Sequence, residues 1–181
     1  MNTRTPTPAP AQTRLAGLQR LRDRLDRWPL DPIALLGRFS VAAVFWHSGQ
    51  TKIEGLAIDL VAGRVELGWP RLAPAAVDLF RDEYRLPLLD PGVAAVLAAC
   101  GEHVLPLMLL LGLGTRAAAA GLLGMTLVIQ LFVFPGAYPT HGVWAAVLAG
   151  LLARGPGALS LDHLLVRRWG WRLSSARPRA D

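Results

Sequence analysis

Three ionisable residues interrupt long apolar runs of this chain, and their positions predict an ion pair. Arg38 lies roughly 9 Å from one end of its run, and Glu102 lies roughly 16 Å from the opposite end of another, at the 1.5 Å rise of a helix. If both runs cross a bilayer core about 30 Å thick, their depths differ by only about 5 Å. An arginine side chain covers that gap, so the spacing predicts a buried Arg38–Glu102 pair with His103 nearby. Its role stays open between a clamp joining two helices and a proton relay or ligand site.

A second group of polar residues is expected in one layer near the outer ends of the runs. It consists of His47, Gln50, Gln130 and His141, with Trp46 and Trp144 beside them. Polar groups at such depth normally face a bundle interior or a wet cavity. The layer predicts a concave site that opens to the outside and suits a flat apolar ligand with one or two hydrogen-bonding oxygens. The competing interpretation is that each group satisfies a backbone carbonyl, and Lys52 is expected to snorkel into the headgroups.

The same residues argue against several other chemistries. Glu102 and His103 are adjacent and project about 100° apart on a helix, so the spacing gives no metal-binding motif. Ser48 has no identifiable base or orienting acid, which argues against a serine nucleophile. Cys100 is the single cysteine, so the sequence contains no CxxC motif and no intrachain disulfide.

The composition explains why these polar residues stand out. The chain has 181 residues, the expected size of one domain, and 52% of them are hydrophobic against 18% charged. Soluble domains carry about 25% charged residues. Here the charges gather in blocks between apolar runs, which excludes a disordered chain and favours a membrane protein. With those runs, the net charge of +6 points to an anionic membrane surface and not to nucleic acid.

Four of the apolar runs are predicted to be transmembrane helices. The clearest, residues 117–135, has nineteen positions without a charge, close to the roughly twenty that cross a bilayer. The predicted spans are residues 32–50, 91–114, 116–135 and 140–154, within a membrane domain of residues 32–156. The expected fold class is therefore all-α, a four-helix transmembrane bundle with amphipathic interfacial helices.

Arginine placement predicts the orientation of these spans. Six arginines precede the first span, six follow the fourth, and Arg116 lies in the turn between the second and third. The long connection at residues 53–90 instead has four arginines against seven acids. By the positive-inside rule, both termini are cytoplasmic and the 53–90 loop lies outside.

The segments around the spans also carry local signals. Residues 1–31 are expected to be disordered at first and then amphipathic, and residues 157–181 form a basic tail. Ser160 is expected to cap a helix in that tail. In the outer loop, Pro74 is expected to begin a helix.

Several segments resemble the DoxX family of small bacterial membrane proteins. The most recognisable are an H-x-G-x-x-K pattern at residues 47–52, and the acid Glu102 followed by a Leu/Gly-rich run that ends in G-x-x-T-R at residues 112–116. The similarity extends over about residues 39–165. It implies a four-helix bundle in the bacterial inner membrane. It also implies likeness to the small subunit of a thiosulfate:quinone oxidoreductase and to membrane redox complexes that handle thiols.

The predicted function is that of a membrane subunit of a redox system. It would bind a quinone, the candidate cofactor, or a small thiol-derived ligand in the outward-facing pocket, with a partner protein completing the chemistry. Whether the chain is itself catalytic stays open. The alternatives are a small carrier, which needs a polar pathway through the bundle, and a scaffold that docks a partner protein through the 53–90 loop.

Overall fold

The computed structural model describes residues 30–59 and 63–169, and the fold below concerns these residues. The chain divides into two units, Met1–Leu30 and Asp31–Asp181. The amphipathic segment expected within residues 1–31 and the end of the basic tail therefore lie outside the described residues, apart from the first residues of α2.

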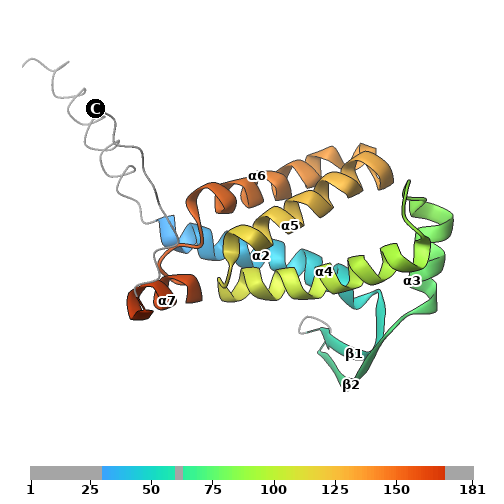
Figure 1. Cartoon of the computed structure of the whole chain (residues 1–181), viewed down its shortest axis with the longest axis horizontal. Coiled ribbons are helices and arrows are strands. Elements are labelled where there is room, and N and C mark those ends of the chain that lie inside the picture. The colour runs from blue at the N-terminus through green and yellow to red at the C-terminus, as the bar shows by residue number, and fades with distance from the viewer. Residues whose placement is uncertain (1–29, 60–62, 170–181) are drawn as a thin grey trace, which may run out of the picture. The chain divides into compact units, whose positions relative to one another are not determined.

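Four long helices dominate the described residues (Figure 1). α2 spans Leu30–Gln50, α4 spans Pro91–Leu111, α5 spans Thr115–Val128 and continues as the π-helix η2 over Ile129–Val133, and α6 spans Tyr138–Arg154. α5 contacts both α4 and α6. One buried apolar cluster draws on all four helices, through Val41, Phe45, Leu109, Ala118, Ala119, Leu122, Leu148 and Leu151. The two alanines let neighbouring helices approach closely, as is common where helices pack in lipid.

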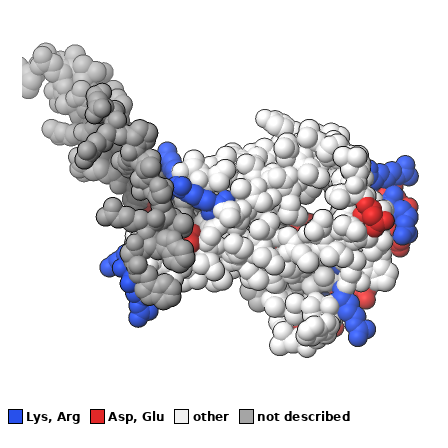
Figure 2. Space-filling model, in the orientation of Figure 1, with Lys and Arg blue, Asp and Glu red and all other residues white. Residues whose placement is uncertain are grey.

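The outer surface of these helices is apolar. Among the described residues, two helical stretches are long and apolar enough to cross a membrane, Pro91–Leu111 and Thr115–Val133. Their outward side chains include Leu97 and Leu127, which are 58% and 57% exposed. In Figure 2 the charged side chains gather at the two ends of the helices and leave the surface between them largely uncharged. Such a surface is suited to contact with lipid.

Local capping defines both ends of α4. Asp90 Oδ1 accepts hydrogen bonds from the backbone N–H groups of Gly92 (2.9 Å) and Val93 (3.2 Å), and Pro91 occupies the first turn, where no N–H is needed. At the other end Gly112 adopts a left-handed φ of 68°. A Cβ there would also collide with the Arg38 guanidinium and the backbone of Ser160. Only glycine satisfies both the turn and the close approach.

A short helix joins the long helices at the end where α4 stops and α5 starts, which is called the inner end below, the opposite end being the outer end. α7 spans Leu161–Trp169, and Ser160 Oγ accepts from the His163 N–H at 3.2 Å, which confirms the predicted cap. The Asp162 carboxylate reaches the start of α5 and accepts from the N–H groups of Gly114 (2.8 Å) and Thr115 (3.0 Å). One acid thereby caps the start of α5, where the helix dipole also favours a negative charge.

The outer connection corrects the all-α expectation. It contains an antiparallel hairpin of β1 (Ile53–Asp59) and β2 (Arg64–Leu72), then α3 (Pro74–Leu79) and the π-helix η1 (Phe80–Tyr84). Apolar and polar residues alternate along 64–67, which is the period of a strand with two unlike faces. The helix expected at Pro74 is confirmed. A short 3-10 turn, η3 (Pro135–Ala137), links η2 to α6.

We expect Asp162→Ala to destabilise the fold by about 0.5–2 kcal/mol, because two N–H groups at the start of α5 lose their acceptor. Asp78→Ala is the matched control, since that acid makes only an exposed ion pair with Arg81 and should cost about 0–1 kcal/mol. Denaturant titration followed by circular dichroism in detergent measures both. Equal losses for the two variants would contradict the capping role.

Candidate functional site

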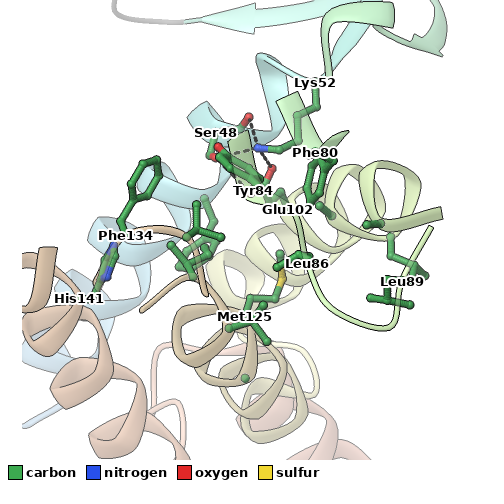
Figure 3. Close-up of a pocket in the computed structure, with 18 of the residues that line it drawn as sticks. Ser48, Lys52, Phe80, Tyr84, Leu86, Leu89, Glu102, Met125, Phe134 and His141 are labelled. Atoms are coloured by element: carbon green, nitrogen blue, oxygen red, sulfur yellow. Dashed lines mark hydrogen bonds and ion pairs between the residues drawn. The ribbon is translucent and has the colours of Figure 1, made fainter. Parts of the chain in front are cut away.

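A cavity of about 430 Å³ lies among α2, α4, α5, η2, α6 and the outer-loop helix η1 (Figure 3). Its walls are mainly aliphatic and aromatic, with Phe45, Phe80, Met125, Phe134 and Trp144 among the lining residues. The few polar lining side chains are those of Ser48, Lys52, Tyr84, Glu102 and His141. The cavity is therefore apolar with polar groups confined to a few points, as is usual for small-molecule sites.

Three of these polar residues form a closed network at one wall of the cavity (Figure 3). Lys52 Nζ lies 2.7 Å from Glu102 Oε2, and the two side chains are 5% and 4% exposed. Ser48 Oγ donates to Glu102 Oε1 at 3.0 Å, and Lys52 Nζ donates to Ser48 Oγ at 3.1 Å and to the Ser48 carbonyl at 3.3 Å. The Lys52 ammonium thus donates two hydrogen bonds to Ser48 and forms an ion pair with Glu102, and the carboxylate keeps lone pairs to spare.

The local sequence explains how this network forms. Ser48 and Lys52 are four residues apart at the end of α2, so their side chains share one face. Gly49 lies against α4, where a Cβ would come within 2.8 Å of the His103 ring and 3.0 Å of the Glu102 Cβ. The absence of a side chain at position 49 allows α4 to approach closely enough for Glu102 to reach Lys52. The glycine and lysine of the H-x-G-x-x-K pattern therefore have a packing role and an electrostatic role.

The predicted Arg38–Glu102 pair is wrong. Arg38 is fully buried but donates to the Leu159 carbonyl at the inner end, beside Gly112. Glu102 lies ten residues before Gly112, which places it about 15 Å further out along α4. Counting residues along each helix assumes that the inner ends of the two helices are level. In the structure, the first two turns of α2 extend beyond the inner end of α4. Lys52, expected to snorkel, is the actual partner of Glu102.

His103 and Gln50 belong to a second, outer network. His103 Nδ1 lies 2.6 Å from the Ala99 carbonyl, so it carries the proton, and Nε2 accepts from Gln50 Nε2 at 2.9 Å. Gln50 Oε1 in turn accepts from the Ile58 N–H at 2.7 Å. Trp46 stacks edge-on against His103 at 5.0 Å between centroids. These residues fasten the hairpin to the helices, and none of them lines the cavity.

His141 and Gln130 form a third pair. His141 Nδ1 lies 2.8 Å from Gln130 Oε1, and Gln130 Nε2 donates to the Pro135 carbonyl at 2.7 Å. Because that carbonyl needs a donor, the amide orientation is fixed, and Oε1 must accept from His141 Nδ1–H. The neutral His141 ring therefore keeps Nε2 as an acceptor. His141 is 5% exposed and lines the cavity, with Trp144 at 5.0 Å between ring centroids.

The predicted outer layer is thus divided. His141 and Trp144 line the cavity, whereas Gln50, Gln130 and Trp46 support the hairpin or the η2–α6 turn and do not line it. His47 is exposed on α2, and neither His47 nor Gln130 lines the cavity, so the cavity does not support the expectation that they share a ligand. Ser48, Lys52 and Tyr84 were not predicted to line the site. For Ser48 and Lys52, the i, i+4 spacing in the sequence indicates that their side chains lie close together.

Aromatic side chains from the two π-helical segments meet at the cavity. Tyr84, at the end of η1, packs edge-on against Phe134, which follows η2, at 5.8 Å between centroids, and both line the cavity. Burial raises the pKa of the Tyr84 hydroxyl above its usual value, and the negative charges of Glu102 and Glu83 raise it further. Tyr84 therefore offers a neutral hydroxyl.

Comparison with known proteins supports the resemblance drawn from the sequence. The family model for DoxX matches residues 33–135, more than half of the chain, and it confirms the predicted family. Neither the comparison with curated proteins nor the comparison with solved structures gives a match. The matched region includes Ser48, Lys52 and Glu102 but ends before His141.

We expect Lys52→Met or Glu102→Gln alone to destabilise the protein by about 3–5 kcal/mol, because each leaves a buried partner without its counter-charge or acceptor. The double variant should lose clearly less than the sum, since the two residues are in direct contact. Unfolding of the four proteins in mixed detergent, followed by circular dichroism, measures this coupling.

A second cycle serves as the control. Arg38→Met and Glu102→Gln should be additive within about 0.5 kcal/mol, because the two side chains have different partners. Coupling between Arg38 and Glu102 that equals the coupling between Lys52 and Glu102 would contradict the arrangement of the site.

Proposed function

Because the chain belongs to the DoxX family of membrane proteins, we propose that it is a four-helix protein of the bacterial inner membrane and a quinone-binding subunit of a redox system. The single core shared by α2, α4, α5 and α6 supports a bundle in which all four helices cross the bilayer. Arg116, Arg154, Arg167 and Arg168 lie at the end that carries α7. By the positive-inside rule that end, with both termini, faces the cytoplasm.

The observation that carries the quinone proposal is the cavity. Its volume of about 430 Å³ lies within the usual range of about 300–1,000 Å³ for small-molecule sites. Apolar and aromatic walls fit a ring with an apolar tail, and the polar atoms at Glu102 and His141 fit oxygen substituents. A small thiol-derived anion would leave most of the apolar lining without contacts. Of the two expected ligand classes, the lining therefore favours the quinone.

The acceptors of the site suit the reduced, hydroxyl-bearing form, and the neutral Tyr84 hydroxyl can donate to or accept from a ligand oxygen. Glu102 is an acceptor, His141 Nε2 is an acceptor when the ring is neutral, and Lys52 is engaged by Ser48 and Glu102. A hydroquinone carries two O–H donors that such acceptors can bind. These acceptors would also receive the protons released when a hydroquinone is oxidised. The electrons would pass to a partner protein of the redox system.

A lateral route from the bilayer supports the same ligand. Leu89, Leu97, Val128 and Phe134 line the cavity and are also 46%, 58%, 39% and 48% exposed. In the proposed topology their exposed portions face lipid, where quinones reside. The ligand would then enter between α4 and the end of α5 without crossing water. No comparable observation on the described residues favours the carrier, and a scaffold role would depend on the hairpin considered below.

The test is to identify lipids and quinones retained on the protein purified from its membrane, by mass spectrometry, and then to block the cavity. Gly124 lines the cavity, and a Cβ added there would meet no atom within 4 Å. We expect Gly124→Phe to lower the affinity for decylubiquinol by about 5- to 150-fold, because a ring placed in the site costs about 1–3 kcal/mol of binding energy. Isothermal titration in detergent under anaerobic conditions measures the affinity.

Gly150→Phe is the matched control. Gly150 also lies within a long helix, is exposed, has open space around its added Cβ, and does not line the cavity. Its variant should bind decylubiquinol as the unaltered protein does. Equal binding by all three proteins, or no binding by any, would contradict the proposed site.

A further inference from the structure

The β1–β2 hairpin presents an apolar face to the outside of the chain. Val65, Leu67 and Trp69 alternate along β2 and are 61%, 79% and 83% exposed. Successive side chains of a strand point to opposite faces, so Val65 and Leu67 share one face. Trp69 follows two residues later, where the register of the two strands shifts between Glu54 and Leu56. Cross-strand neighbours extend the shared face, because Leu56 pairs with Leu67 and Ile58 with Val65.

The opposite face of the hairpin is polar. Arg64 and Glu66 alternate with the apolar residues of β2, and their cross-strand neighbours are Asp59 and Ala57. Both Arg64 and Glu66 are exposed. The hairpin is therefore an amphipathic sheet of two strands with one apolar and one charged face. A surface of this kind is stable at a boundary between an apolar phase and water.

Hydrogen bonds hold the hairpin beside the outer end of α2. Trp46 Nε1 donates to the Ile58 carbonyl at 3.1 Å, and the Ile58 N–H donates to Gln50 Oε1 at 2.7 Å. Trp46 and Gln50 lie in the last turns of α2, so Ile58 is level with the helix and not beyond its end. The same bonds satisfy backbone groups on the free edge of β1, which is a condition for placing a strand next to hydrocarbon.

The base of the hairpin is fixed at the same level on α4. Leu72, the last residue of β2, packs against the cluster of Phe80, Ala94 and Ala95. Ala94 and Ala95 lie about one turn inside the outer end of α4. Figure 1 shows the hairpin beside this half of α4, and contacts between β2 and α4 agree. Both attachments thus put the hairpin at the depth of the outer helix ends.

We propose that the apolar face of the hairpin inserts into the outer leaflet, at the boundary between headgroups and acyl chains. Exposed apolar side chains on the outer turns of α4, such as Val93 at 51% and Val96 at 47%, continue the lipid-facing surface beside it. Tryptophan is enriched at that boundary, where Trp69 would lie. Arg64 and Glu66 stay in water on the opposite face. The lipid surface rests on the transmembrane topology proposed above, but it does not depend on a ligand in the cavity.

Site-directed fluorescence on the full-length chain tests this placement. In a Cys100→Ser background, single cysteines at Val65, Leu67 and Trp69, and at Arg64 and Glu66 as opposite-face controls, are labelled with the polarity-sensitive NBD group. The labelled proteins are reconstituted in phosphatidylcholine/phosphatidylglycerol vesicles. Lipids with a nitroxide near the headgroup quench from the bilayer, and iodide quenches from water.

The expected result is an alternating pattern. NBD at 65, 67 and 69 should emit at shorter wavelength, be quenched by the nitroxide lipid and resist iodide, whereas NBD at 64 and 66 should show the reverse. Strong iodide quenching at all five positions would overturn the proposal by placing the hairpin in water. Resistance to both quenchers on the apolar face would overturn it in favour of a protein partner or a second copy. The three apolar positions report independently if one variant fails to fold.

Discussion

A buried charge needs its counter-charge close by, and in this protein that requirement joins the end of α2 to α4. Lys52 and Glu102 are almost fully buried and lie 2.7 Å apart. Neither charge is tolerable there without the other. Ser48 completes the network, and Gly49 lets the two helices come close enough to form it. The position of the outer half of α4, and with it one wall of the cavity, follows from this contact.

Most other polar side chains of the membrane region serve the backbone. Gln50 and Trp46 satisfy the edge of β1, Gln130 satisfies the Pro135 carbonyl after the π-helical turn, and Arg38 satisfies the Leu159 carbonyl. Non-helical backbone near lipid has to find such partners within the protein. The polar groups that remain on the cavity wall are few for this reason, and the cavity is correspondingly apolar.

The sequence predicts the helices well because apolar length and the Ser160 cap are local signals. The family follows from motif spacing and is confirmed. The site is predicted less well, since depth counting along separate helices assumes that their ends are level. The offset of α2 against α4 moves Arg38 away from Glu102 and brings Lys52 to it. Helix rotation is also invisible to depth counting, so His47 was expected inside and is exposed. The hairpin was missed because its alternating residues were treated as part of a loop.

The inner end of the structure has a mechanical consequence. The segment around α7 is bonded to three helices at once, through Ala158 to Asp31 and Leu159 to Arg38 on α2, and through Asp162 to Gly112 and to the start of α5. It also follows α6 directly in the chain. A pulling force on α7 is therefore shared among the ends of all four helices, and α6 is not drawn out of the bundle alone.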